Sequence, residues 1–246
     1  MSRVQVLLLS IAVSFAVAYG TARADESGEQ LLAKYRSFMG WNLGDATINA
    51  IRIKGRVADQ STFDEICKPS RFAQYNIGLQ SGRSFLVESD EGSGWISHQG
   101  QAKDFPPPIA QDVFTQSLLL CNAFGSYPAT LVSNIAGSGT KWPMGFGVVA
   151  LSIPREPAVL LAINKQTGEL TSVVIDGIAS YDAAGLRSID ATHRIYTRWK
   201  RKLPDDTTAD MVITAVQLNI EVDEAIFARS TQDTPPPRDA VPPVTF

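Results

Sequence analysis

Two histidines, His98 and His193, are the only imidazoles that this chain of 246 residues offers for acid–base or nucleophilic chemistry. A Ser/His/Asp or Cys/His arrangement would have to use one of them, since imidazole is the usual base that activates such nucleophiles near neutral pH. His98 lies in the polar run 97–100, and His193 stands beside Arg194 in an expected strand. Because the sequence assigns neither a partner, we interpret both as ordinary surface or half-buried histidines.

The compact motifs of common active sites are missing as well. The sequence contains no Gly-x-Ser-x-Gly elbow, no His-Glu-x-x-His zinc pattern and no Gly-x-x-x-x-Gly-Lys phosphate loop. The cluster Gly137–Thr140 has no lysine at the required place and is typical of a turn. Carboxylates are plentiful but stand mainly in turn-like surroundings. We therefore predict no catalytic residue, no metal site and no cofactor, and keep an enzyme as the third hypothesis.

Cys67 and Cys121 are the two cysteines of the chain. They lack the close spacing of metal ligands, so a zinc site is not expected. In an exported protein such a pair can form a disulfide, which here would close a loop of roughly 50 residues. Two separate buried thiols are the alternative, because free cysteine is also a common core residue.

Large apolar side chains are the remaining candidates for contact with a ligand. Aromatic residues are spread over the expected strands and the second expected helix, and the sequence does not divide them between a core and a cavity. A curved sheet with helices over its concave face can leave a lined hollow for an acyl chain. The residues that we expect to contact such a ligand are Phe85, Trp95, Phe114, Leu118, Phe124 and Phe146.

A basic run near the C-terminal strands has two interpretations. Arg198, Lys200, Arg201 and Lys202 surround Trp199 and would suit an anionic head group or an acidic partner. A solvated hairpin end is the simpler interpretation, since charged residues usually face water.

The N-terminal segment predicts export. Arg3 is followed by an uncharged stretch, 4–22, with an apolar centre, and Ala22-Arg23-Ala24 fits the Ala-x-Ala pattern of a cleavage site. Ser10, Ser14, Tyr19 and Gly20 make a poor spanning helix and weaken the alternative of an uncleaved anchor. We expect a signal peptide over 1–24, cleavage after Ala24 and a mature chain that starts at Asp25 in the periplasm, with no membrane span left.

Charge excludes one class of partner. Without Arg3 and Arg23 the mature chain carries 20 basic and 25 acidic residues, a formal charge of −5. This balance argues against nucleic acid and against an anionic membrane surface held by charge alone. A mature chain of this length can bury one large core, so a single domain over 25–230 is expected.

Two helices are predicted from hydrophobic spacing. Ser27 and Gln30 form a capping box before the apolar positions of 31–39, and Gly40 stands at the expected end. A second helix is expected between the prolines 106–108 and Gly125, with apolar residues on a wide face.

Strands are predicted from alternation with a period of two. The segments are 51–57, 73–79, 85–87, a strand beginning at Trp95, 148–153, 158–163, 170–175, 189–199 and 211–220. No βαβ rhythm is present, so the pattern indicates an α+β fold built from an antiparallel meander. The proline-rich segment 231–246 is expected to be an extended tail.

Several short stretches resemble one family of envelope proteins. They are Tyr35–Gly40 with Ile48–Gly55, Lys68-Pro-Ser-Arg-Phe72, Gly94-Trp95, Ile163–Gly168, Val216–Asn219 and Asp223–Phe227. Their order over about residues 30–228 is similar to that in the outer-membrane lipoprotein carrier (LolA-like) superfamily. The chain departs from the family pattern at Gly92-Ser93, which replaces Asp-Gly, at Asn164, which replaces Asp, and after Phe227, where a proline is missing.

The resemblance implies a strongly curved antiparallel sheet, an incomplete β-barrel, with helices over its concave face. It also implies a periplasmic carrier for a lipid or lipoprotein acyl chain. Our own candidate for the lid of such a carrier is the second helix. No functional residue of the family is carried over. The alternative is a sensory or protein-interaction module of the same fold with a filled core, whose partner would be another envelope protein.

Overall fold

The computed structural model describes residues 26–57, 61–77, 83–88, 93–98, 101–132, 145–153, 158–175, 177–228 and 242–246. The predicted signal peptide and cleavage point, and the predicted turn Gly137–Thr140, lie outside them. Among the described residues no helix is both long and apolar enough to cross a membrane.

The first helix, α1, spans Gly28–Met39 and has the ends that its sequence predicts. The Ser27 hydroxyl accepts a hydrogen bond from the Gln30 N–H at 3.2 Å, and the Gln30 side chain accepts one from the Ser27 N–H at 2.8 Å. Gly40 ends the helix in the left-handed conformation, with φ of 80°. Glycine adopts this conformation without the steric cost of a Cβ atom, so the chain can turn sharply here.

In the described residues, fourteen strands form one antiparallel sheet. The first part of the chain contributes β1 (Ile51–Val57), β2 (Thr62–Lys68), β3 (Arg71–Ile77), β4 (Arg83–Glu88), β5 (Ser93–His98) and β6 (Gln101–Asp104). The second part contributes β7 (Ala129–Val132), β8 (Phe146–Leu151), β9 (Val159–Asn164), β10 (Leu170–Ile175), β11 (Ala179–Ser188), β12 (Arg194–Lys202), β13 (Thr208–Leu218) and β14 (Val244–Thr245).

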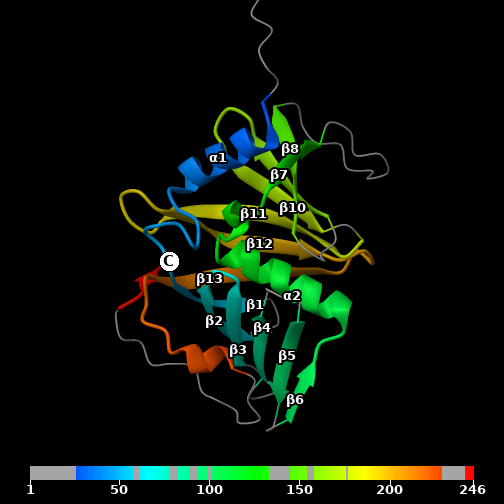
Figure 1. Ribbon diagram of the computed structural model, residues 1–246, viewed down its shortest axis with the longest axis vertical. Coiled ribbons are helices and arrows are strands. Elements are labelled where there is room, and N and C mark those ends of the chain that lie inside the picture. The colour runs from blue at the N-terminus through cyan, green and yellow to red at the C-terminus, as the bar shows by residue number, and fades with distance from the viewer. Residues whose placement is uncertain are drawn as a thin grey trace, which may run out of the picture.

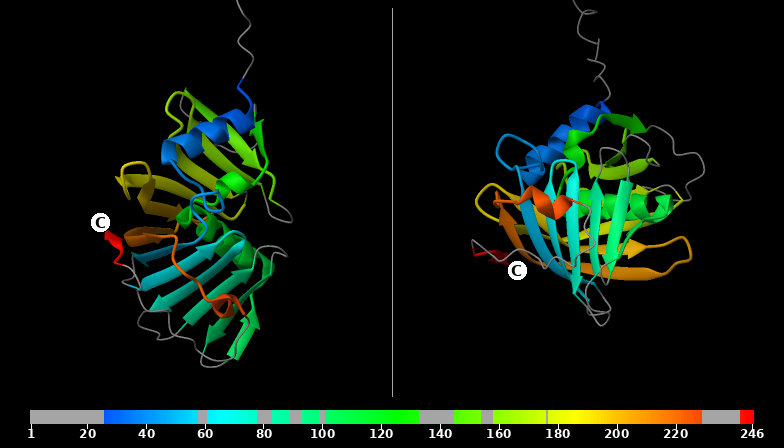
Figure 2. Two further views of the ribbon diagram at one scale, coloured as in Figure 1. Left: turned by 60° about the vertical axis from the view of Figure 1, so that its left-hand side comes forward. Right: turned by 60° about the horizontal axis from the view of Figure 1, so that its bottom comes forward.

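The two parts are joined by the pairing of β1 with β13. The strand order is β6-β5-β4-β3-β2-β1-β13-β12-β11-β10-β9-β8-β7, with β14 added on β13. Within the described residues β6 and β7 form the two ends of this path and do not pair with each other. The sheet curves strongly but stays unclosed (Figures 1 and 2), as an incomplete barrel does. The predicted fold class is therefore confirmed.

Both helices lie on the concave face. α1 packs over β7 and β8, and the second helix, α2 (Pro107–Leu120), crosses the middle of the face between the two parts of the sheet (Figure 1). α2 begins within the proline run, because Pro107 and Pro108 occupy its first turn, where no intrahelical N–H donor is needed. α2 ends at Leu120, before the expected end at Gly125. Gly125 instead lies in a separate 3₁₀ turn, η1 (Phe124–Ser126), that follows the helix.

The two faces of the sheet carry separate apolar clusters. Cys67 and Phe72 belong to the large cluster on the concave side, which includes both helices. Their neighbours Ile66 and Ala73 belong to a smaller cluster, since successive side chains of a strand point to opposite faces. A second 3₁₀ turn, η2 (Glu224–Phe227), covers this convex cluster through Phe227.

Some strands were not predicted from the alternation of apolar and polar residues in the sequence. β11 is a strand of ten residues, but its burial alternates irregularly and three of its five apolar residues are alanines. It forms because Tyr181 enters the core while long pairing with β12 fixes its backbone. β2 was also not expected: five successive residues are buried, which leaves no alternation to detect.

Candidate ligand-binding site

The side chains of the predicted lid helix that the structure describes, 110 and 112–120, are all buried or half-buried. Phe114 is 4% exposed and Leu118 is 1% exposed, and Phe124 of η1 is fully buried. The ring of Phe114 meets the ring of Phe72 edge to face, with centroids 5.7 Å apart. Three of the six expected ligand-contacting residues therefore come together, inside the main core and with apolar neighbours of the chain itself around them.

The other three expected residues lie apart from this group. Trp95 of β5 is buried in the convex cluster with Phe227, so the sheet separates it from Phe114. Phe146 is half-buried at the start of β8, in the other part of the sheet. For Phe85 the structure describes the backbone, which pairs with Gln74 and Ile96 in β4. A ligand-contacting role for these residues stays a prediction.

The expected disulfide joins Cys67 of β2 to Cys121, the residue that ends α2. The Cα atoms are 6.3 Å apart, a separation that a disulfide spans without distortion of the backbone. Both cysteines are fully buried. The bond therefore fixes the C-terminal end of α2 to the first part of the sheet.

A carboxylate fixes the other half of α2 to the second part of the sheet. Asp112 accepts a hydrogen bond from the Tyr181 hydroxyl of β11 at 2.6 Å and forms a salt bridge with Arg201 of β12. Gln116, one turn further along α2, donates to the same carboxylate at 3.3 Å. Burial, and then the charge of Asp112, raise the pKa of Tyr181, so the tyrosine stays a donor. The helix thus bridges both parts of the curved sheet.

A buried carboxylate lies beside the disulfide. Glu65 of β2 is fully buried, and Gln74 donates to its Oε2 atom at 3.3 Å. Burial raises the pKa of Glu65 to about 7, although the Ser117 hydroxyl and the Gln74 amide act in the opposite direction. Ligand atoms of Glu65, Cys67 and Cys121 lie within 4.8 Å of one another. Because the two sulfur atoms are bonded to each other, they are not thiolates and do not present a metal site.

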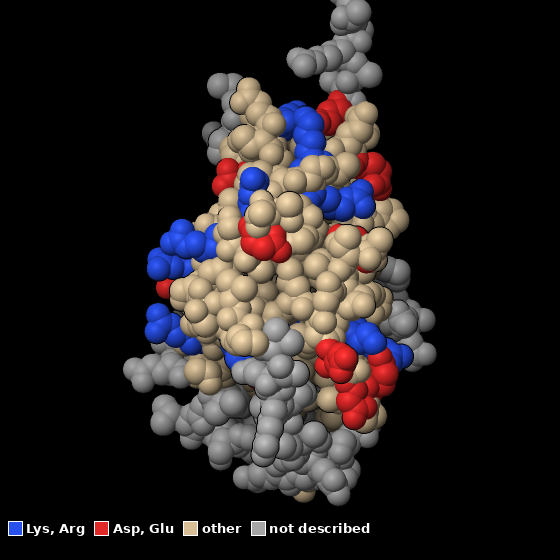
Figure 3. All heavy atoms as spheres, turned by 90° about the vertical axis from the view of Figure 1, so that its left-hand side faces the viewer, with Lys and Arg blue, Asp and Glu red and all other residues tan. Residues whose placement is uncertain are grey.

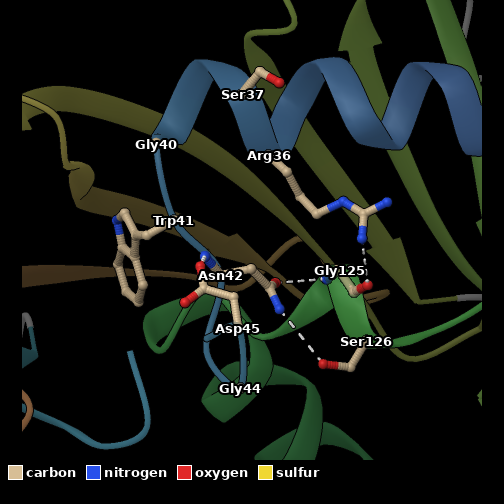
Figure 4. A pocket seen from close by; sticks show the side chains of 9 residues that line it. All are labelled: Arg36, Ser37, Gly40, Trp41, Asn42, Gly44, Asp45, Gly125 and Ser126. Atoms are coloured by element: carbon tan, nitrogen blue, oxygen red, sulfur yellow. Dashed lines mark hydrogen bonds between the residues drawn. The ribbon is translucent and has the colours of Figure 1, made fainter. Parts of the chain in front are cut away.

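A polar hollow that the sequence did not indicate lies below the end of α1 (Figure 4). Its volume is about 450 Å³. The lining comes from α1, from the segment that follows Gly40 and from η1: Arg36, Ser37, Gly40, Trp41, Asn42, Gly44, Asp45, Gly125 and Ser126.

Most polar groups of this hollow are engaged in holding its own walls together. Asn42 accepts from the Gly125 N–H at 2.7 Å and donates to the Leu43 carbonyl at 2.8 Å. Asp45 accepts from the backbone N–H groups of Asn42, Thr47 and Ile48 at 2.7–3.0 Å. Burial raises the pKa of Asp45, but these hydrogen bonds outweigh burial and lower it overall.

Arg36 is the one charged donor that the hollow offers. It donates to the Gly125 carbonyl at 3.2 Å, and Figure 4 shows its guanidinium reaching from α1 toward that carbonyl. A small polar or anionic group is the chemistry that fits here, by contrast with the apolar interior under α2. The available sequence signal was the cluster of turn-forming residues after Gly40, which marks a loop but not a pocket.

A second hollow, of about 560 Å³, lies on the other side of α1 and shares Ser37 with the first. Its cations already have partners. Lys34 pairs with Glu26 at 2.6 Å, and Arg194 donates to the Phe38 carbonyl at 2.8 Å while its guanidinium lies 5.0 Å from the centre of the Phe38 ring.

The histidines and the basic run have mostly structural contacts. The Nδ1 atom of His193 lies 2.5 Å from a carboxylate oxygen of Asp190, within the turn before β12. His98 lies at the end of β5, and the structure describes its backbone but not its side chain. Arg198 and Lys200 are exposed, and Lys202 pairs with Asp206 at 2.6 Å. Arg201 differs from the rest of the run, because it turns inward to Asp112.

Comparisons with known proteins show which fold this is. Three solved structures match: a domain described as an outer membrane lipoprotein-sorting protein from Vibrio parahaemolyticus, a LolA superfamily protein from Nitrosomonas europaea and a DUF1329 family protein from Desulfovibrio piger. Their TM-scores are 0.55, 0.54 and 0.54, at 9%, 12% and 10% identity. The matches cover 81%, 82% and 82% of this chain and 95%, 98% and 95% of those chains.

No family model and no curated protein matches the sequence. The likeness to the three structures therefore lies in the fold. The chain has the LolA-like fold that its short motifs resemble, with an unclosed curved sheet and two helices.

Proposed function

We propose that this chain, which shares the fold of lipoprotein-sorting proteins, is a periplasmic binding protein for a lipid or lipoprotein acyl chain. The observation that carries the proposal is the position of α2, an apolar helix laid across the concave face of an unclosed sheet. The apolar side chains below it, among them Phe114 and Leu118, would form the walls of the acyl site once the helix moves. The proposal assigns no catalytic residue and no cofactor.

The two attachments of α2 differ in kind, which suggests how it would open. The disulfide at Cys121 is covalent and keeps the C-terminal end of the helix on β2. The N-terminal half depends on the noncovalent contacts of Asp112 with Tyr181 and Arg201. Opening would therefore start at the N-terminal half, with Cys121 as the fixed end.

The energetics of loading favour a long apolar chain. The described core is filled by the protein's own side chains, so a ligand has to replace contacts that Phe114 and Leu118 make in the closed form. Each buried methylene contributes about 0.8 kcal/mol, so an acyl chain of a dozen carbons gains on the order of 10 kcal/mol before these losses. A short or strongly polar ligand would not offset the opening of α2.

Native mass spectrometry and lipid extraction test this proposal. The full-length gene is expressed with export in a Gram-negative host, and the protein is purified without detergent. We expect bound amphiphile on a fraction of the molecules, and a higher fraction on Asp112→Asn, in which the N-terminal half of α2 is released. Asp182→Asn, at an exposed position of β11, is the matched control and should load like the wild type. Protein that stays free of lipid in all three forms would contradict the proposal.

A second candidate function follows from the filled core itself. Because Phe114, Leu118 and Phe124 are at most 4% exposed, the same fold would also serve as a rigid sensory or interaction module in the envelope. Affinity capture from an envelope fraction separates the two functions. The module should retain a protein partner and no lipid, whereas the carrier should retain lipid.

A further inference from the structure

β13 has one edge that β12 covers only in part. β12 pairs with β13 through Arg198–Lys202, which lie opposite Thr208–Val212. On its other edge β13 pairs with β1 from Met211 to Leu218. Beyond Val212, in the part of the chain that the structure describes, β12 makes no ladder pair with β13. The ladder between β12 and β13 ends there, and a stretch of the β13 edge remains open to another occupant.

The segment Val244–Phe246 of the same chain occupies this stretch. β14 is antiparallel to β13, with Thr245 opposite Ala215 and Val244 opposite Val216. The Phe246 N–H donates to the Thr214 carbonyl at 3.0 Å. In the left-hand view of Figure 2 the segment, marked C, lies beside β13.

Main-chain bonds, rather than side chains, hold this segment. Val244 is 38% exposed and Phe246 is 41% exposed. Among the described residues they are the large apolar residues that remain exposed to solvent. Thr245 is exposed as well. A strand of two residues with little side-chain burial is weak, since main-chain pairing alone adds little net free energy.

We propose that the open edge of β13 at Thr214–Val216 is a strand-addition site for an extended peptide segment of another protein, and that Val244–Phe246 is its exchangeable intramolecular occupant. An added strand gains its affinity from main-chain hydrogen bonds and its selectivity from alternate side chains. The intramolecular segment covers the edge when no partner is bound, because the unpaired N–H and C=O groups of an uncovered strand edge can pair with other chains and cause aggregation.

The surroundings define the partner's chemistry. Figure 3, which views the side of the molecule on which the C-terminal end lies, shows a broad uncharged area between charged groups. The natural occupant is likewise uncharged: two prolines, Pro242 and Pro243, lead into a β-branched pair and an aromatic ring. We therefore expect an uncharged, extended segment with β-branched or aromatic residues. It must pair over more than two residues, because the tethered segment competes at a high effective concentration.

Two substitutions at one position test whether the segment is seated by its main chain. Phe246→Pro removes the N–H that donates to Thr214, whereas Phe246→Ala removes the exposed ring and keeps the N–H. Hydrogen exchange followed by mass spectrometry on peptides covering 213–218 should show exchange about tenfold faster in Phe246→Pro. Exchange in Phe246→Ala should stay near the wild type. Equal exchange in all three proteins would overturn the proposal.

A peptide titration then tests whether the site accepts a segment from another molecule. The probe is a dye-labelled peptide with the sequence of residues 240–246 in which valine replaces Pro242 and Pro243, so that it can pair over more than two residues. The control peptide carries proline in place of the phenylalanine and of the second of these valines. In fluorescence anisotropy we expect the probe to bind full-length Phe246→Pro at least about tenfold more tightly than the wild type, because the intramolecular competitor is weakened. The control peptide should bind neither protein.

Two results would overturn the proposal. One is a probe that binds the wild type and Phe246→Pro equally or not at all, which would place its contact elsewhere or deny a site. The other is a wild-type dimer in sedimentation velocity that disappears in Phe246→Pro, since the occupant would then be a second copy of this chain. Neither result depends on whether α2 covers a lipid.

Discussion

Cys67 and Cys121 are bonded with their Cα atoms 6.3 Å apart, although 54 residues separate them in the chain. The bond joins an interior strand of the first part of the sheet to the end of the helix that crosses toward the second part. On the far side of the same helix, Asp112 contacts β11 and β12. One helix therefore ties together the two parts of the sheet, which are joined within the sheet by the pairing of β1 with β13.

Removal of the disulfide should lower stability without a change of fold. Constraint of a loop of this length contributes about 4 kcal/mol through the unfolded chain. We expect the double substitution Cys67→Ala and Cys121→Ala to lower the free energy of unfolding by about that amount in a denaturant titration. The wild type in a dithiol reductant should shift to the same midpoint. An unchanged midpoint under reduction would contradict the prediction.

Glu65 should make the protein less stable as the pH rises from about 4.5 to about 7. Its pKa in the folded protein is about 7, against an ordinary value of 4.5, so in this window the folded state keeps a proton that the unfolded state releases. The contribution is fully present below pH 4.5 and is lost as the pH passes 7, with a total of about 3 kcal/mol.

The substitution Glu65→Gln isolates this effect. We expect it to flatten the dependence of the free energy of unfolding on pH between 5 and 7.5 and to raise stability at pH 8 relative to the wild type. Glu221→Gln, at an exposed position, is the control and should retain the wild-type slope. Parallel curves for wild type and Glu65→Gln would refute the assignment.

Asp112→Asn should weaken the attachment of α2 more than the loss of one neutral hydrogen bond. The change leaves the Arg201 cation, with a side chain 24% exposed, without its carboxylate, and we expect a loss of about 2 kcal/mol. Tyr181→Phe removes one donor to the same carboxylate and should cost about 1 kcal/mol. Thermal unfolding of the two variants beside the wild type gives the order. A larger loss of stability for Tyr181→Phe would show that the tyrosine hydrogen bond, and not the ion pair with Arg201, is the stronger attachment of α2.

Gly40→Ala should be strongly destabilising, whereas Gly177→Ala should be mild. Both glycines have positive φ, 80° and 69°. A Cβ atom on Gly40 would lie 2.0 Å from the Thr192 carbonyl oxygen, whereas nothing lies within 4 Å of one on Gly177. The second variant therefore reports the backbone cost alone, about 1 kcal/mol, and the difference between the two reports the close approach. Equal midpoints in urea would show that the turn before β12 moves aside.

Local signals in the sequence proved sufficient for the elements that have strong periodicity or caps. α1 begins and ends as Ser27, Gln30 and Gly40 predict, because capping depends on residues within one turn. The hairpin of β9 and β10 follows from the turn at Asn164–Gly168 in the same way. The strands β2 and β11 were missed, since their burial is set by neighbours distant in the chain.

The site was predictable only in part. Aromatic and aliphatic residues on α2 pointed to an apolar interior, and Phe114, Leu118 and Phe124 do meet there. Trp95 appeared equivalent in the sequence, yet its strand parity places it in the convex cluster with Phe227. A shift of one residue along a strand reverses the face, so composition alone does not assign a side chain to one side.

By itself, the sequence determined the α+β class, the limits of α1, the antiparallel alternation and the presence of two cysteines able to pair. Those properties depend on neighbouring residues and on simple periods. The tertiary structure alone decided that Cys67 meets Cys121, that Glu65 is buried beside them and that Val244–Phe246 joins β13. These contacts bring together residues far apart in the chain, and only the curvature of the folded sheet sets their distances.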